Sequence, residues 1–198
     1  SELIELSLEG RIIRRIALIG PNAERGQVQG GGSAQVRVNR PVGILAALRD
    51  RGAEVVSAAG CSIAKRLPTL RGAFEITYTD ATTDLATVPV ERLQLMWMDD
   101  PAPGVHRHAF ALRLAGTFTP STTGEWVFGL VAVGSAVMRV NGEIVVDLST
   151  PQTGGAFFGL GSPEVRGSVV LEEGVVATVE IEQPFAAYTE LRGLFVGA

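Results

Sequence analysis

The chain has 198 residues, of which 46% are hydrophobic and 19% charged, and its formal net charge is −4. This composition is typical of a folded globular protein with room for one large domain or two small ones. The acidic balance, without a basic stripe interleaved with aromatic residues, excludes nucleic acid as a partner. No apolar run approaches the ~20 residues of a membrane-spanning helix, which excludes a membrane partner as well.

The N-terminus and the cysteine content bear on compartment and redox chemistry. The chain begins SELIELSLEG, which is acidic and lacks the positive n-region of a signal peptide, so the compartment stays undetermined. Cys61 is the only cysteine in the sequence, which excludes a disulfide within the chain. Because it follows an apolar strand, we expect Cys61 to be a buried small residue rather than a reactive thiol.

The first third of the chain has the pattern of a strand–helix–strand unit. Residues 12–19 predict a strand, residues 39–41 predict a helix start, and residues 54–58 predict a second strand. Gly52 fits the residue that ends the helix. A crossover of this kind implies a parallel sheet. One unit cannot bury both faces of its sheet, so we expect exposed apolar surface, through which the chain would form a homodimer.

Two loops follow the first predicted strand. Residues 20–22 read Gly-Pro-Asn, and residues 30–34 read Gly-Gly-Gly-Ser-Ala. They fall at the carboxyl end of the strand, which is the edge where open α/β sheets bind ligands. Three consecutive glycines let the backbone approach a ligand closely because no Cβ intrudes. The spacing does not match a dinucleotide fingerprint or a phosphate-binding loop, so nucleotide binding is excluded.

From residue 67 onward the helical periodicity gives way to alternating strands. Phe110, Leu112 and Leu114 share one strand face and leave Arg113 on the other. Residues 141–142, Asn-Gly, predict a two-residue hairpin. The sequence therefore predicts a mainly β protein, in which an antiparallel β-sandwich over residues 67–198 follows a small βαβ piece over residues 1–66.

The first of these regions resembles glycoside hydrolase family 3. Residues 18–23 read LIGPNA and residues 30–34 read GGGSA, and this text is similar to the α/β-sandwich domain of the β-glucosidases in that family. The second region resembles the protective-antigen-type β-sandwich that is often inserted into that domain. The matching text is LRLAGTFTP at 112–120, TGEWVFGL at 123–130, VNGEIVVD at 140–147 and FFGLGS at 157–162.

The resemblance implies a parent enzyme that hydrolyses terminal β-linked glucosyl residues with retention. Retaining glycosidases use two carboxylates. In the family one lies on a barrel domain and the other follows the β insert. No residue of this chain matches either, so we expect no catalytic residue and no activity from the chain alone. The implied partners are a β-glucoside or oligosaccharide, together with the barrel and the remaining sandwich of the parent enzyme.

Five residues are candidates for contact with substrate. The resemblance places Gly31, Gly32 and Ser33 beside the non-reducing-end sugar, where the hydroxyl of Ser33 would reach a sugar hydroxyl. The alternative is that these glycines only make a tight turn and that Ser33 caps backbone groups. Phe157 and Phe158 lie in a Gly-rich stretch outside clear alternation, so an exposed ring is expected to stack on sugar. The alternative is that both rings belong to the sandwich core.

Other polar clusters are weaker candidates. Asp99 and Asp100 are too few for calcium, which needs six or more oxygen ligands. His106 and His108 are expected to share one face of a strand, but no third ligand stands at a recognisable spacing for zinc. We therefore expect no metal and no cofactor.

Two other kinds of protein fit the same sequence. The chain could be a stand-alone carbohydrate-binding or adhesive β-sandwich, with residues 1–66 as a packing segment. It could also be a structural interaction module, which would not respond to sugar. Sugar binding by the isolated chain discriminates between these alternatives.

Overall fold

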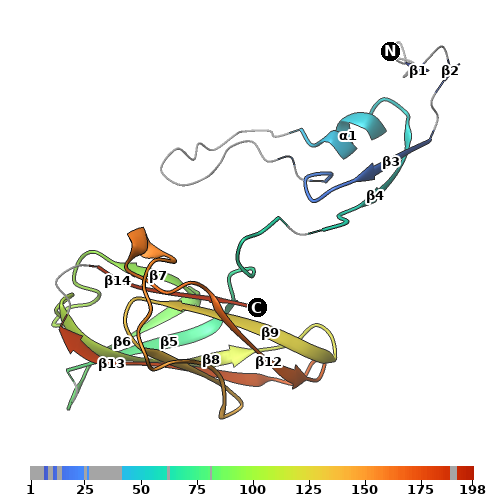
Figure 1. Cartoon of the computed structure of the whole chain (residues 1–198). Coiled ribbons are helices and arrows are strands. Elements are labelled where there is room, and N and C mark those ends of the chain that lie inside the picture. The colour runs from blue at the N-terminus through green and yellow to red at the C-terminus, as the bar shows by residue number, and fades with distance from the viewer. Residues whose placement is uncertain are drawn as a thin grey trace. The chain divides into compact units, whose positions relative to one another are not determined.

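The computed structural model describes residues 7–8, 11–12, 15–24, 26, 42–61, 63–80, 82–187 and 191–198. The chain divides into two compact units, Ser1–Ala64 and Lys65–Ala198 (Figure 1). Each unit has its own sheet structure. Within the described ranges, no helix is long and apolar enough to cross a membrane.

The N-terminal unit contains the predicted βαβ arrangement. Strand β3 (Arg15–Ile19) pairs in parallel with β4 (Glu54–Ala58), and helix α1 (Ile44–Arg49) lies between them in sequence. The strand predicted over residues 12–19 is seen over residues 15–19 as β3, while residues 13–14 lie outside the described residues. Its first part belongs to β2 (Arg11–Ile12), which pairs antiparallel with β1 (Ser7–Leu8).

Helix α1 starts later than the sequence predicts. Gly43 precedes it with extended backbone, and the N–H of Leu45 donates to the carbonyl of Ala23 at 3.2 Å. The predicted start at residues 39–41 lies outside the described residues. The predicted end is confirmed, because Gly52 adopts a left-handed φ of 78° and its N–H donates to Arg49 O at 2.9 Å.

The parallel pair exposes apolar side chains, as expected of a two-stranded sheet. Ile19 on β3 is 72% exposed and Val56 on β4 is 51% exposed. The prediction of a buried Cys61 is wrong, since this cysteine is exposed. It follows β4 in a bend, and a two-stranded sheet provides little mass to cover a residue beyond its end.

The C-terminal unit is an antiparallel β-sandwich, which confirms the predicted fold class. The six-stranded sheet has the order β11 (Glu143–Leu148), β10 (Ala136–Val140), β13 (Ala177–Ala187), β8 (Ala109–Phe118), β5 (Arg71–Thr79) and β6 (Asp84–Arg92). The four-stranded sheet has the order β12 (Val165–Leu171), β9 (Gly124–Ala132), β14 (Arg192–Gly197) and β7 (Gln94–Trp97).

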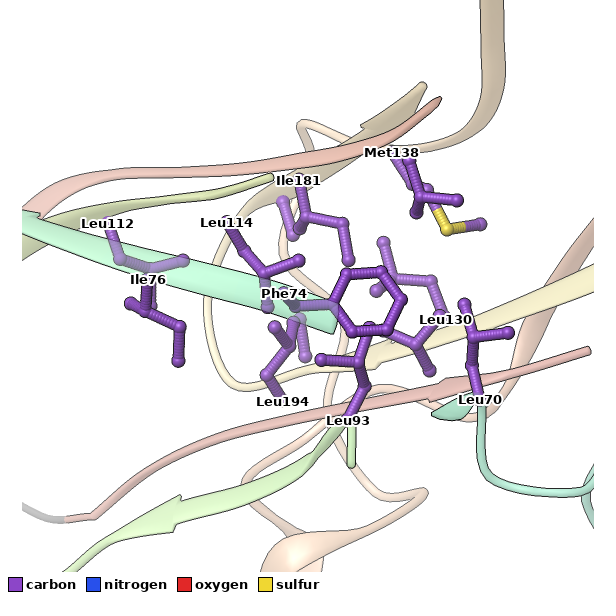
Figure 2. Packing of buried hydrophobic residues seen from close by; sticks show 14 of the residues in the cluster. Leu70, Phe74, Ile76, Leu93, Leu112, Leu114, Leu130, Met138, Ile181 and Leu194 are labelled. Carbon is purple, nitrogen blue, oxygen red and sulfur yellow. The ribbon is translucent and has the colours of Figure 1, made fainter. Parts of the chain in front are cut away.

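The core forms where the inner faces of the two sheets meet. Phe110, Leu112 and Leu114 of β8 are each at most 1% exposed, so the alternation predicted for this strand is confirmed. Figure 2 shows the ring of Phe74, from the six-stranded sheet, pointing toward Leu130 of the four-stranded sheet. Burial of these interleaved faces is the main force that holds the sandwich together.

The Asn-Gly hairpin is also confirmed. Asn141 and Gly142 connect β10 to β11 with φ angles of 51° and 80°. Both values are positive, as a two-residue type I′ turn requires. The side-chain oxygen of Asn141 also accepts from the N–H of Thr178 at 2.9 Å, which ties the turn to the neighbouring strand β13.

A buried arginine crosses between the sheets at one end of the sandwich. Arg192, at the start of β14, is 0% exposed. Its guanidinium donates to the carbonyl of Phe110 and to the Gln183 side-chain oxygen, and it lies 4.0 Å from the centroid of the Phe110 ring. Gln183 in turn donates to the carbonyl of Val133 at 3.2 Å. These bonds connect β14 to strands of the opposite sheet.

Replacing this arginine should destabilise the sandwich strongly. We expect Arg192→Leu to lower the free energy of unfolding by about 3 kcal/mol, because two buried oxygen acceptors lose their donor. Urea denaturation followed by tryptophan fluorescence measures the change. Arg113→Leu is the matched control, since Arg113 makes an exposed ion pair with Asp84 and its loss should cost below about 1 kcal/mol. Equal losses in the two variants would contradict the structural role of Arg192.

Candidate functional site

Three loops of the C-terminal unit meet at the end of the sandwich where β14 begins. Strand β7 ends at Trp97, which pairs with Arg192, and the loop of residues 98–108 follows it. The β9–β10 connection starts at Val133, whose N–H donates to the carbonyl of Gly193 at 2.9 Å. The loop of residues 149–164 reaches the same end through Ser162, whose N–H donates to Ala132 O at 2.9 Å.

The tip of the third loop is a left-handed turn, named η2 (Phe157–Gly159), which appears as the orange coil beside the labels of β7 and β14 in Figure 1. Phe157, Phe158 and Gly159 have φ angles of 50°, 61° and 91°. The turn is closed by bonds from Gly159 N to Ala156 O at 2.9 Å and from Leu160 N to Phe157 O at 3.2 Å. A bridge between residues 156 and 161 completes a small hairpin.

The two phenylalanines of the turn have different environments. Phe157 is half-buried and packs on a small cluster formed by Val131, Ala156 and Phe195. Phe158 is 84% exposed, the highest value among the large apolar residues that the structure describes as exposed. The two alternatives given for this pair therefore each hold for one ring. Phe157 packs in a small core, and Phe158 faces solvent.

The loop is held at both ends by side chains that the sequence analysis did not single out. At its start, Asp147 Oδ1 accepts from the N–H of Ser149 at 2.8 Å, and this bond lowers the pKa of Asp147. At its end, the buried Ser162 accepts through Oγ from the N–H of Ala132 at 3.2 Å. Glu164 then accepts from Leu67 N at 2.9 Å and from Arg166 Nε at 2.7 Å. The turn is therefore presented on a fixed base.

Gly193 is a further residue of the site that sequence analysis missed. It lies inside β14, and the ring of Phe157 occupies the space where its side chain would be. A glycine inside a strand often marks a close approach of another group. That signal was present in the sequence, but it does not say which group approaches.

The other predicted substrate residues, Gly31, Gly32 and Ser33, lie outside the described residues. Their predicted contact with sugar stays a prediction.

A second cluster lies on the loop between β7 and β8. Asp99, Asp100, His106, Arg107 and His108 line a hollow of about 500 Å³. Arg107 is its centre, because its backbone N–H donates to Asp100 Oδ1 at 2.9 Å and its guanidinium donates to Met98 O at 2.6 Å.

The strand expected around the two histidines is wrong. β8 begins at Ala109, and the histidines lie on the turn before it. The reason is local, since bonds from Arg107 to the aspartate side of the loop compete with strand pairing. Among the described residues, no group of three or more His, Cys, Asp or Glu side chains is placed to hold a metal ion.

A larger hollow, of about 790 Å³, lies elsewhere on the sandwich, over the six-stranded sheet. The residues that line it include Ala115, Thr117, Glu75, Glu91 and Glu180. None of the candidate substrate or metal residues named in the sequence analysis lines it. It is an open trough on a sheet face, so we place the candidate site at the loop end instead.

Comparison with known families decides the classification. Residues 73–189 match the PA14 domain family over more than half of the chain. The chain belongs to the PA14 domain family. The match confirms the protective-antigen-type β-sandwich that the sequence motifs indicate, and its range includes the three loops described above.

The curated relatives of this PA14 protein are β-glucosidases. The chain is 35% identical over 183 residues to a probable β-glucosidase H of Neosartorya fischeri. This alignment covers 87% of the chain and 22% of that relative. It is 34% identical over 166 residues to a β-glucosidase of Rhizobium radiobacter. That alignment covers 79% of the chain and 20% of the relative. The resemblance to a β-glucosidase is thus confirmed, and the chain spans about a fifth of these relatives.

A solved structure shows the same fold over most of the chain. The β-glucosidase of Kluyveromyces marxianus in complex with glucose superimposes with a TM-score of 0.70 and 22% sequence identity. The match covers 98% of this chain and 26% of that enzyme. At this identity the likeness shows the fold alone.

The anchor of the PA14 loop can be tested through Ser162. We expect Ser162→Ala to lower the free energy of unfolding by about 1–2 kcal/mol, because the buried N–H of Ala132 loses the hydroxyl that it binds. Amide hydrogen exchange should quicken at residues 154–162. Ser168→Ala is the control, because Ser168 is an exposed serine of the same sheet that bonds to Glu125. Unchanged exchange in the loop would contradict the anchoring role.

Proposed function

We propose that the chain is the accessory region of a β-glucosidase, consisting of the start of its α/β sandwich over residues 1–66 and a PA14 domain over residues 67–198. The complete enzyme would hydrolyse terminal β-linked glucosyl residues. This region would shape the substrate pocket without supplying the catalytic carboxylates. The likeness to β-glucosidases over 79–87% of the chain supports the proposal.

Phe158 is the observation that carries the proposal. Its ring is 84% exposed on a turn whose two flanks are bonded to the sandwich. An exposed ring held on a fixed turn is available to an apolar partner, and contact with one would remove its area from water. The flat apolar face of a glucosyl unit is a suitable partner, because aromatic rings stack on apolar faces with well-defined geometry.

The mechanism assigned to the region is positioning. Phe158 would contact the sugar units beyond the scissile bond and hold the substrate in register with catalytic groups on the rest of the enzyme. The loop would also exclude water from that side of the pocket. Gly31, Gly32 and Ser33 would border the terminal sugar, where glycine allows close approach and Ser33 offers a hydroxyl.

The exposed face of the βαβ piece fits the same proposal. Ile19 and Val56 present apolar surface that a two-stranded sheet cannot cover by itself. In the complete enzyme, the remaining strands and helices of the α/β sandwich and the barrel would bury it. A homodimer through this face is the alternative for the chain alone.

Loss of the Phe158 ring should weaken substrate binding in the complete enzyme. We expect Phe158→Ala to raise KM for cellobiose about fivefold to tenfold, the effect of losing roughly 1–1.4 kcal/mol of aromatic contact. The value of kcat should change less than twofold, since the ring acts by binding. Steady-state kinetics with cellobiose and with longer β-glucan oligomers measures both constants.

The control is Val170→Ala. Val170 is 73% exposed on β12, near the opposite end of the sandwich, so its loss should leave KM unchanged. If Phe158→Ala also leaves KM unchanged for every substrate length, Phe158 does not contact substrate and the proposed role of the loop is wrong.

A second measurement discriminates the accessory role from an autonomous sugar-binding module. The isolated chain, labelled with ¹⁵N, is titrated with glucose, cellobiose and a longer β-glucan oligomer. An accessory region whose pocket is completed by other domains should give no shifts, or shifts confined to residues 156–160 at tens of millimolar sugar. Saturable binding at micromolar sugar would favour a stand-alone carbohydrate-binding domain.

A further inference from the structure

Two turns of the sandwich begin with a pair of consecutive positive-φ residues, and the residues in the two pairs are very different. In the β10–β11 hairpin, two consecutive residues with positive φ are Asn141 and Gly142. In the turn that follows Ala156, Phe157, Phe158 and Gly159 all have positive φ, and the first two are phenylalanines. Asparagine and glycine are the residues that this geometry prefers. The second turn therefore holds two bulky side chains in a conformation that their backbones disfavour.

Something outside the turn has to compensate for this preference. An L-residue in the left-handed region brings Cβ close to the following carbonyl oxygen, which disfavours each such residue. The hydrogen bonds that close the turn join backbone atoms, such as Gly159 N and Ala156 O, so they do not depend on aromatic side chains. The packing that offsets the disfavoured conformation must therefore come from a side chain. Phe158 contributes little packing because it is almost fully exposed, which leaves Phe157.

The ring of Phe157 supplies this packing. It fills a slot that Gly161 and Gly193 leave open because they have no side chain. A Cβ on Gly193 would lie 2.5 Å from Cε1 of Phe157 and 2.6 Å from its Cδ1 and Cζ atoms. A Cβ on Gly161 would lie 2.9 Å from Cδ2 of the same ring. Real Cβ atoms are excluded at these distances, so only glycine at both positions admits the ring. Val131 and Phe195 form the rest of the contact surface.

We infer that Phe157 is the positioning residue of the turn, and that the Gly161–Gly193 slot which receives its ring keeps Phe158 in a left-handed conformation facing solvent. Because the two residues are consecutive and both left-handed, fixing one ring against the sheet fixes where the other one projects. The inference rests on the proposed function, in which Phe158 is the residue that meets sugar. It adds that the identity of residues 157, 161 and 193 sets the geometry of that contact.

The first experiment asks whether Phe157 controls the backbone of Phe158. A residue with positive φ gives a strong intraresidue NOE between its amide and α protons. We expect this signal at Phe158 in the unaltered chain and its loss in Phe157→Ala, because the ring that compensates for the disfavoured conformation is gone. Val131→Ala is the control. It lowers stability by opening the same cluster, but it should leave the Phe158 signal in place.

The second experiment measures the disfavoured conformation itself. We expect Phe158→Gly to raise the folding equilibrium constant about fivefold, because glycine adopts positive φ freely and the exposed ring contributes little packing. Phe185→Gly is the matched control. Phe185 is also exposed, at 44%, but it lies within strand β13, where glycine is unfavourable and the folding constant should fall.

The outcomes separate this inference from the proposed function. Persistence of the positive-φ signal in Phe157→Ala, or a fall in the folding constant of Phe158→Gly equal to that of Phe185→Gly, would overturn the inference whatever sugar does. Loss of the signal together with stabilisation by Phe158→Gly would support it. An unchanged KM for Phe158→Ala in the complete enzyme would instead reject the proposed function, and the positioning of Phe158 would still be decided by these two readouts.

Discussion

Burial of strand β14 on both of its faces is the constraint on which the candidate site depends. Its inward residues, Leu194 and Val196, join the core between the sheets. Its outward residues would face water on an uncovered sheet, but Phe195 is only 6% exposed because the loop of residues 149–164 lies over it. The loop is thus a third layer added to one end of a two-layer sandwich. Its tip can carry an exposed ring because its base is part of a packed surface.

The features that sequence analysis predicted are those with a local physical cause. Alternation along β8 and the Asn-Gly turn depend on neighbouring residues in the chain, and both are present. The end of α1 follows from the freedom of Gly52 to adopt positive φ. The presence of one exposed phenylalanine near residues 157–158 was also among the expected alternatives, because Gly-rich text does not alternate.

The features that it missed depend on contacts between distant segments. Helix α1 begins at Ile44 because Ala23 binds its first turn, and no local pattern reports that. The histidines beside Arg107 are an exception, because they lie on a turn through a contact within their own loop, where Asp100 accepts from the backbone N–H of Arg107. The left-handed Phe-Phe pair contradicts local preference, and the slot that we infer to hold it includes Gly193, which lies 36 positions after Phe157. Such conflicts between local preference and structure are concentrated where function places a demand.

The side chains of Asp147 and Ser162 each accept a hydrogen bond from a backbone N–H at one end of the loop of residues 149–164. Neither bond involves the residues at the tip of the loop. Each fixes a strand end through its own side chain, and the intervening backbone bonds mostly to itself. Loop residues other than Ala156 and Phe157, which pack against Phe195, can therefore change in number and kind without breaking either bond. In the proposed enzyme, the substrate range would therefore change through replacement of this one loop, while the two sheets stay the same. Each new loop would need a side chain that packs over Gly193 of β14, as Phe157 does.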